Sequence, residues 1–514
     1  MDTILVLDFG GQTAQLICRR IRDAGVYSII VPGDQPLEGD LLRDLKGIVL
    51  SGSPHSVYEP SAPRPDPSLH AAGVPILGIC YGLQRLVTDS GGQVAAGATR
   101  EYGRSRVHIR EPSPLFDGVE DGFVSWMSHS DVIERAAGMT TLAVSENGHP
   151  AAMQDGGTTY GLQFHPEVSH CEFGTRILSN FAAAVCRARR EWNMDRFLDA
   201  AAGRVRRQVG AAPVVTLISG GVDSAVVAAL LLHILEPDQV HLLYVDTGLM
   251  RDAETEEVMA SLRELGATNL HAVDASRRFF AALSGVIDPE RKRTAVGDEF
   301  VRVAMDELER LGVANAYLAQ GTLYTDLIES GKGVGSHADV IKSHHNVRSP
   351  LIEAKRSSGV LVEPLADLYK DEVRRLGRKL GLSARVVGRH PFPGPGLSVR
   401  ILGEVTRERC RTLRAADRIL IEELRSRGLY DAIWQAFCVL LPVQSVGVAG
   451  DVRRYGSVVA IRAITSEDGM TADVYPMAAD DLLEISSRIT NAVPEVGRVV
   501  YDVSSKPPAT IEWE

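Results

Sequence analysis

Ser219-Gly220-Gly221-Val222-Asp223-Ser224 is the stretch around which the rest of the chain is organised. An apolar run, Val214 to Ile218, precedes it, and a longer apolar stretch, Ala225 to Leu235, follows it. This order predicts a buried strand, a tight turn made by the paired glycines, and a helix. Glycines let the backbone approach a bulky anion, and the free N–H groups at a helix start donate to it. An ordinary strand-to-helix turn is the alternative, but the complete hexapeptide favours a phosphate site.

The side chains of the hexapeptide suit the same chemistry. The hydroxyls of Ser219 and Ser224 can donate to phosphate oxygens, and Asp223 can hold a cation against them. No lysine follows the glycines, so the stretch is not the loop that grips a γ-phosphate through G-x-x-x-x-G-K-[ST].

The composition restricts the class of protein. The chain has 514 residues, 45% of them apolar and 24% charged, which is typical of a soluble globular protein of about three domains. Its formal charge of −11 argues against a general nucleic-acid binder. The six scattered cysteines and an N-terminus without a leader pattern favour the cytoplasm. Asp223 interrupts the most apolar segment, so we expect no membrane span there.

Residues 1 to about 190 alternate strand and helix patterns, which predicts a doubly wound, mostly parallel sheet. A helix is expected over residues 12–24 with Gly25 at its C-terminal end. The expected strands are 4–8, 27–31, 47–51 and 75–79.

Gly78-x-Cys80-x-Gly82 has the spacing of a nucleophile elbow and stands between a predicted strand and a predicted helix. The glycines permit the bend that exposes the cysteine, and the N–H of Tyr81 is then free for an oxyanion. A lone cysteine is usually an inert buried residue, which is how we interpret the other five.

A thiol needs a base at neutral pH, and His165-Pro166-Glu167 offers one. Residues two apart on an extended chain face the same side, so Glu167 can orient the ring of His165 towards the thiol. A single histidine at a strand end is more often structural, but its combination with the elbow favours catalysis.

Cys80, His165 and Glu167 together resemble the class I glutamine amidotransferases. The resemblance implies attack of the thiol on the glutamine amide, a thioester, and release of ammonia. It also implies that Gly52 supplies the second oxyanion donor. The family usually has glycine where this chain has Ser53 and Ser130. His129 is interpreted as structural or glutamine-positioning.

A second domain is expected from residue 191 to 389, after a helical connector, Arg187 to Arg207. Further strands are predicted at 240–248, 270–273 and 316–320, with a helix at 253–265, and nucleotide should bind at the carboxyl ends of these strands. The hexapeptide resembles the pyrophosphate loop of the N-type ATP pyrophosphatases. That resemblance implies attack on the α-phosphate of ATP and places Val245 beside the nucleotide.

Several later stretches have less definite patterns. The charged run 288–293 is interpreted as a solvated helix start. His344 and His345 invite a zinc interpretation, but adjacent residues cannot easily share one tetrahedral site. The stretch 348–359 is expected to be a loop, as is His390 to Leu397 (HPFPGPGL). From residue 390, helices at 407–427 and 479–492 and strands at 457–464 and 498–502 predict a smaller α+β domain.

The order of these parts, with HHNV, HPFPGPGL and SSKPPATIEWE, resembles the glutamine-hydrolysing GMP synthetases over nearly the full length. The resemblance divides the chain into domains 1–190, 191–389 and 390–514. It implies that XMP is adenylylated by ATP with Mg²⁺, and that ammonia from glutamine displaces AMP. It also implies XMP contacts by Arg293, Lys506 and Glu512, and a homodimer formed by the last domain.

Two other functions are compatible with the same motifs. One is a related ATP-pyrophosphatase amidotransferase that aminates a different nucleotide or carbonyl acceptor. The other is a nucleotide-sensing protein built on a decayed enzyme, which should have lost catalytic residues. Cys80, His165, Glu167 and Asp223 are all present, which argues against it.

Overall fold

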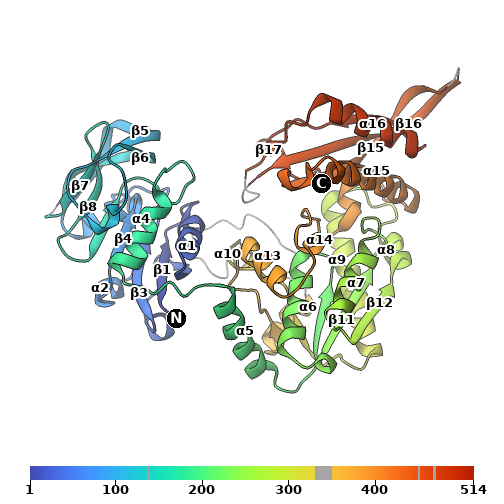
Figure 1. The fold of residues 1–514 in the computed structure, drawn as a ribbon, viewed down its shortest axis with the longest axis horizontal. Coiled ribbons are helices and arrows are strands. Elements are labelled where there is room, and N and C mark those ends of the chain that lie inside the picture. Colours follow the sequence, from blue (N-terminus) through green and yellow to red (C-terminus); the bar gives the residue numbers. More distant parts are fainter. Residues whose placement is uncertain (137, 330–349, 450–451, 467–470) are drawn as a thin grey trace. The chain divides into compact units, whose positions relative to one another are not determined.

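The computed structural model describes residues 1–514 except 137, 330–349, 450–451 and 467–470 (Figure 1). Residue contacts divide the chain into two compact units, of which the first contains Met1–Ala200 and the described residues 325–329. The second contains Ala201–Tyr324 and the described residues after 349. Each unit is described by itself below.

A nine-stranded sheet forms the centre of the first unit. Its first five strands pair in parallel, which agrees with the predicted doubly wound architecture, and the other pairings are antiparallel. In sheet order the strands are β2 (Tyr27–Pro32), β1 (Thr3–Asp8), β3 (Leu45–Leu50), β4 (Ile76–Ile79), β9 (Thr159–Leu162), β8 (Pro150–Gln154), β7 (Thr140–Ser145), β5 (Gln93–Ile109) and β6 (Phe123–Arg135).

Helices cover this sheet, with α1 (Ala14–Asp23) against β2 and α4 (Gly174–Asn180), and α3 (Tyr81–Asp89) against β4 and β9. Gly25 follows α1 with a φ of +84°, the left-handed conformation that ends a helix, as predicted. The remaining helical segments of this unit are η1 (Gly39–Leu41), α2 (Ser68–Ala71), η2 (Pro114–Phe116) and η3 (Phe181–Val185).

The predicted connector helix is partly wrong. Helix α5 covers Met194–Val209, whereas residues 187–193 are irregular. Arg187 has a φ of +53°, which a helix cannot contain, so the chain turns there before α5 begins.

A five-stranded parallel sheet carries the hexapeptide in the second unit. In sheet order its strands are β12 (Asn269–Asp274), β11 (Val240–Asp246), β10 (Val214–Ile218), β13 (Tyr317–Ala319) and β14 (Leu361–Val362). The helices of this region are α6 (Val222–Ile234), η4 (Pro237–Gln239), α7 (Glu254–Glu264), α8 (Ser276–Ala282), α9 (Pro289–Arg310), α12 (Pro350–Ser357), α13 (Lys370–Lys379) and α14 (Ala384–Val387). Helix α10 (Tyr324–Glu329) begins at the last residue of the segment Ala201–Tyr324 and otherwise belongs to the first unit.

One sequence-based interpretation in this region is wrong, and another holds in part. The described part of the expected loop 348–359 contains helix α12, which begins at Pro350 and carries an ion pair of 2.9 Å between Glu353 and Arg356. The run 288–293 does begin a helix and exposes Asp288, Glu290 and Arg291. Lys292 is the exception: it is fully buried, and its ammonium donates to the carbonyl of Ile401 at 2.7 Å.

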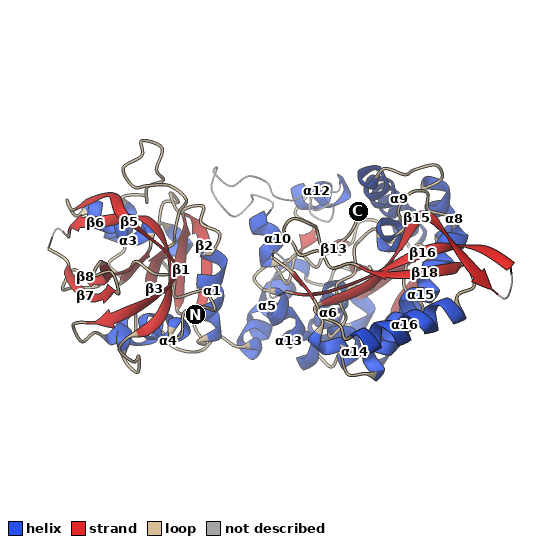
Figure 2. Cartoon of the chain, turned by 90° about the horizontal axis from the view of Figure 1, so that it is seen from above, coloured by secondary structure: helices blue, strands red, loops and turns tan. Residues whose placement is uncertain are grey.

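The C-terminal part contains a four-stranded sheet covered by two helices (Figure 2). Strand β15 was missed from the sequence; Pro442 interrupts its apolar run, and its pairing with β16 shifts register there. The elements are η5 (Gly396–Arg400), α15 (Arg407–Ser426), η6 (Tyr430–Ala432), β15 (Gln435–Ala449), β16 (Val452–Thr465), β17 (Asp473–Val474), α16 (Ala479–Ala492) and β18 (Val496–Tyr501).

One apolar core runs through the second unit. It includes Val215 and Val245 from the parallel sheet, Phe279 from α8, and Leu413 and Ile461 from the C-terminal elements. The elements after residue 390 therefore share a core with the parallel sheet, and the division at 389 stays a prediction. Within the described residues, no helix could cross a membrane, and no cluster of His, Cys, Asp and Glu side chains could hold a metal.

Candidate functional site

Cys80 sits at a strained turn between β4 and α3, with φ +50° and ψ −106°. Such a conformation is rare for a residue with a side chain and marks functional sites. A Cβ at Gly78 would lie 2.5 Å from the main chain of Gly82, and a Cβ at Gly82 would lie 2.4 Å from the carbonyl of Leu50. The glycines on both sides of the cysteine are therefore required for the elbow to form.

His165 follows β9, and its Nδ1 lies 2.7 Å from Oε1 of Glu167, which is fully buried. Burial alone would lower the pKa of His165, but the Glu167 carboxylate and the Cys80 thiol raise it well above its usual value. The thiol, the ring and the carboxylate thus form the predicted arrangement of nucleophile, base and orienting group.

The two predicted oxyanion donors lie beside this group. A Cβ at Gly52 would be 3.3 Å from Cε1 of His165, so the glycine backbone passes next to the ring. Tyr81 is the first residue of α3, where backbone N–H groups lack partners within the helix. Its own side chain is buried and donates to the carbonyl of Pro63.

The hexapeptide forms the predicted strand–turn–helix, with Gly220 at φ +79° and α6 beginning at Val222. The hydroxyl of Ser224 donates to the carbonyl of Gly221 at 3.1 Å and lies 3.3 Å from the hydroxyl of Ser219. These contacts fold the loop back on the helix start, where its N–H groups can face an anion.

Two basic residues from distant segments contact this loop. The ammonium of Lys370 donates to both carboxylate oxygens of Asp223, at 2.7 and 2.6 Å. The buried guanidinium of Arg389 donates to the carbonyl of Gly220 at 3.2 Å, and it also pairs with Glu254 and Glu257. Neither residue was identified from the sequence, because neither stands in a recognisable motif next to the glycines.

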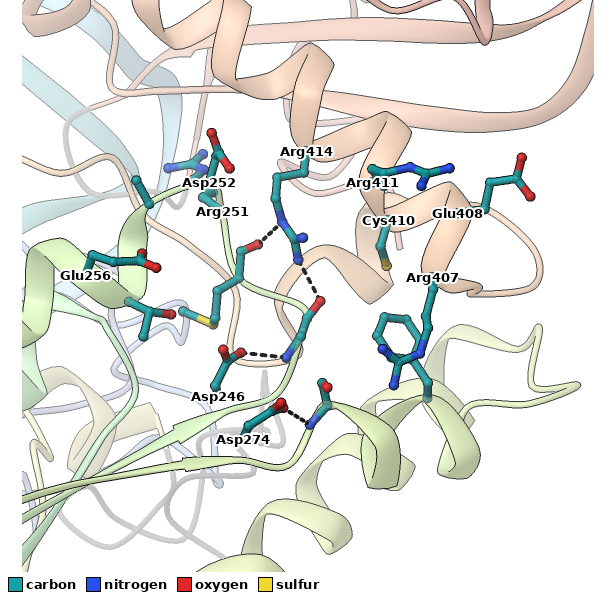
Figure 3. A pocket seen from close by; sticks show the side chains of 16 residues that line it. Asp246, Arg251, Asp252, Glu256, Asp274, Arg407, Glu408, Cys410, Arg411 and Arg414 are labelled. Carbon is teal, nitrogen blue, oxygen red and sulfur yellow. Dashed lines mark hydrogen bonds between the residues drawn. The ribbon is translucent and has the colours of Figure 1, made fainter.

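The side chain of Val245 is buried in the apolar core of the second unit. A pocket of about 630 Å³ lies at the carboxyl ends of strands β11 and β12 (Figure 3). Asp246 and Asp274 face it from the strand ends, and Arg407, Arg411 and Arg414 face it from α15. None of the six hexapeptide residues lines this pocket.

Of the predicted XMP contacts, Arg293 and Glu512 are held by contacts at the C-terminal end of the chain or with it. Arg293 donates to the main-chain oxygen of Glu514. The Glu512 carboxylate accepts from Arg400 at 2.7 and 3.0 Å and from Gln435 at 2.7 Å. Lys506 pairs through its backbone with Ala472. Arg400 and Gln435 were not predicted; only the fold brings them to Glu512.

Known protein families match consecutive parts of the chain. Residues 5–185 match the class-I glutamine amidotransferases, residues 196–325 match NAD synthase, and residues 422–513 match the GMP synthase C-terminal domain. The first two matches contain the cysteine elbow and the hexapeptide, respectively.

Relatives match over the full length. A glutamine-hydrolysing GMP synthase of Symbiobacterium thermophilum is 49% identical over 516 residues, covering 100% of this chain and 99% of that protein. One from Aquifex aeolicus is 48% identical, covering 99% of each chain. The chain belongs to the glutamine-hydrolysing GMP synthase family. The enzyme of Zymomonas mobilis is 47% identical and covers 100% of this chain and 98% of that protein.

Membership of the GMP synthase family confirms the resemblance and the fold class predicted from the sequence. The individual site residues stay predictions, although the geometry brings Cys80, His165 and Glu167 together. The stretch His344 to Val347, which contributed to the resemblance, lies outside the described residues.

Proposed function

We propose that the chain is an ATP-dependent ligase that makes GMP from XMP with glutamine as the nitrogen donor. The observation that carries this proposal is the full-length similarity to glutamine-hydrolysing GMP synthases. The balanced reaction is XMP + ATP + glutamine + water → GMP + AMP + pyrophosphate + glutamate. Ammonia is released in one unit and consumed in the other.

Ammonia release is assigned to the Cys80 site. The thiolate of Cys80 attacks the glutamine side-chain amide, and His165 accepts the thiol proton and returns it to the leaving ammonia. The N–H groups of Gly52 and Tyr81 stabilise the oxyanion, and water then releases glutamate from the thioester. The short contact between His165 and Glu167 supports these roles, because it fixes the ring.

Adenylylation is assigned to the hexapeptide. Ser219, Gly220, Gly221, Val222 and Ser224 hold the phosphates through backbone N–H and hydroxyl groups, and the main chain of Val245 contacts the nucleotide. Lys370 adds a positive charge beside them, which favours departure of pyrophosphate.

The carboxylate of Asp223 is a suitable ligand for Mg²⁺. Mg²⁺ is commonly held by one or two carboxylates together with substrate phosphates and water. The Asp223 carboxylate already holds a cation, the ammonium of Lys370, through both of its oxygens. When bound, the metal neutralises charge on the pyrophosphate leaving group. Asp223 is the residue of this chain that would hold it.

XMP binding is assigned to Arg293, Lys506 and Glu512, with Arg400 and Gln435 orienting the Glu512 carboxylate. The 2-oxygen of the purine is adenylylated, and ammonia then displaces AMP. The N–H groups of a purine can donate to a carboxylate, whereas phosphate is favoured by arginine and lysine.

A homodimer in the cytoplasm completes the proposal. The β15–β16 hairpin exposes several large apolar side chains: Val443, Val446, Val448, Val452 and Tyr455. Exposed apolar patches of this kind mark interaction sites, and strands of a second copy could cover them.

The deciding experiment supplies XMP, ATP, Mg²⁺ and glutamine and measures the formation of GMP and AMP. We expect the two products to appear in equal amounts. ATP consumption that requires some other carbonyl acceptor, with none on XMP, would favour the related amidotransferase instead. Inosinate serves as the control acceptor, because it lacks the 2-oxygen on which adenylylation depends.

A further inference from the structure

A buried histidine–carboxylate pair lies outside the proposed catalytic group of the amidotransferase unit. Glu101 on β5 stands opposite His129 on β6, and Nε2 of the histidine lies 3.2 Å from Oε2 of the glutamate. Their side chains are only 4% and 1% exposed for His129 and Glu101, respectively. Buried ionisable groups are costly, so an arrangement of this kind needs a reason.

The Glu101 carboxylate is held from a third strand. Its Oε1 accepts from the hydroxyl of Ser145, at the end of β7, at 2.7 Å and from the side-chain amide of Asn147 at 2.8 Å. Burial would raise the pKa of Glu101, but the contacts from His129, Ser145 and Asn147 lower it to about 2. The carboxylate is therefore ionised and fixed in one orientation.

The two nitrogens of the His129 ring face different groups. Its Nδ1 lies 3.0 Å from the carbonyl oxygen of Asp131, and a carbonyl can only accept, so Nδ1 donates. Its Nε2 faces the ionised Glu101 carboxylate. The ring thus connects the fixed carboxylate to the backbone of β6 two residues further along.

That stretch of β6 forms one wall of the nucleophile site. The thiol of Cys80 lies 3.9 Å from the carbonyl oxygen of Ser128. The carbonyl of Asp131 also accepts from the side-chain amide of Gln84 at 3.5 Å, and Gln84 donates to Gln163 at 3.4 Å. Gln163 in turn contacts the Cys80 sulfur at 3.7 Å. Polar contacts therefore run from the backbone that His129 holds to the thiol.

We propose that Glu101 and His129 are positioning residues for glutamine, which fix residues 128–131 so that the substrate amide meets the Cys80 thiol in reactive geometry. This inference rests on the proposed glutaminase function of the unit. Supporting groups of this kind matter because a displacement of about 1 Å at a reacting centre can cost about 100-fold in rate.

The test compares Glu101→Ala with Glu101→Gln. The alanine removes the carboxylate beside His129 Nε2 and the contacts that fix it to Ser145 and Asn147, so kcat/KM for glutamine should fall about 10-fold or more, mainly through a higher KM. The glutamine variant keeps an oxygen for Ser145 and Asn147 and a polar group of the same size beside the His129 ring. We therefore expect the kcat/KM of this variant for glutamine to stay within about threefold of the wild-type value.

GMP synthesis from ammonium salt serves as the internal control, because it bypasses glutamine, and it should be unchanged in both variants. Glu111→Ala, an exposed glutamate just beyond β5, is the matched control variant. Unchanged glutamine kinetics in Glu101→Ala would overturn the inference, and so would equal losses in both Glu101 variants.

Should Glu101→Ala also lose ammonium-driven synthesis through misfolding, Asn147→Ala removes one carboxylate contact instead. Its glutamine KM should rise about threefold, and an unchanged KM would overturn the inference. Failure of the proposed overall function is distinguishable: the unchanged chain would then hydrolyse glutamine, with the same dependence on Glu101, but make no GMP.

Discussion

The pKa of His165 depends on two opposing influences at the residue scale. Burial lowers it, and the carboxylate of Glu167 and the neighbouring thiol raise it well above the usual value. A protonated ring beside Cys80 favours the thiolate, the form of cysteine that reacts. Glu167→Gln removes the largest raising influence and leaves burial, so the ring should lose its proton at a lower pH.

The measurable consequence is slower alkylation of Cys80. At pH 7 the rate of inactivation by iodoacetamide should fall about tenfold in Glu167→Gln, because less of the thiol is then held as thiolate by a protonated ring. Glu120→Gln, an exposed glutamate of the same unit, should leave the rate unchanged. Equal alkylation rates in all three chains would show that Glu167 does not control the thiol.

Asp223 and Lys370 form a second residue-scale pair, on which the adenylylation step should depend. Lys370→Met should lower GMP synthesis about 100-fold with glutamine or with ammonium, because a fixed positive charge near the phosphates is lost. Asp223→Ala should abolish synthesis with both nitrogen sources. Lys379→Met, at the exposed end of the same helix, is the control and should retain synthesis.

At the scale of elements, the segment before the HPFPGPGL stretch contacts the hexapeptide loop. Arg389 contacts the carbonyl of Gly220 and two glutamates of α7. Arg389→Ala should raise the KM for ATP about 10-fold or more, since the loop loses a fixed orientation. Arg385→Ala is the matched control, because Arg385 pairs with Glu257 at 3.3 Å without touching the loop. A KM unchanged in Arg389→Ala would contradict this role.

Local patterns made the elements around the site predictable. The strand–turn–helix at residues 214–235 and the elbow at Cys80 depend on glycines and apolar runs that are adjacent in sequence. Residues 350–357 were mispredicted as a loop, since part of what holds their helix comes from a distant segment: Lys355 donates to the carbonyls of Ala314 and Ala316, each at 2.9 Å. Strand β15 was missed because Pro442 interrupts its pattern.

Contacts between distant segments were not predictable. Lys370 lies 147 positions from Asp223, and Arg389 lies 169 positions from Gly220. The Glu101–His129 pair depends on the register of two antiparallel strands, β5 and β6, that the sequence analysis did not propose. Such partners are fixed by topology, whereas a motif records only what is adjacent along the chain.

At the scale of the whole molecule, the exposed β15–β16 hairpin should carry the dimer interface. Val448 and Val452 are 77% and 70% exposed, which is unfavourable for apolar side chains in water. Replacing both valines with aspartate should give a monomer of 55.6 kDa, as measured by analytical ultracentrifugation. Leu483→Asp, equally exposed on α16, should keep the unchanged mass. A double variant of unchanged mass would exclude the hairpin as the interface.

The division of labour between the units allows the two half-reactions to be separated. The Cys80 site lies in the unit that contains Met1–Ala200, and the hexapeptide lies in the unit that begins at Ala201. Cys80→Ala should therefore abolish glutamine-dependent GMP synthesis, a loss of at least about 1,000-fold, because the covalent step is gone. Synthesis from ammonium salt should remain within about twofold, since ammonia then reaches the adenylylated base without glutamine.

Cys171→Ala is the control, because it removes another buried thiol of the same unit and should retain glutamine-dependent synthesis. Ammonia is neutral and small, so an external supply needs no working glutaminase. If ammonium failed to restore synthesis in Cys80→Ala, while the protein remained folded, nitrogen would have to pass from glutamine to the base without free ammonia. The assignment of one half-reaction to each unit would then be wrong.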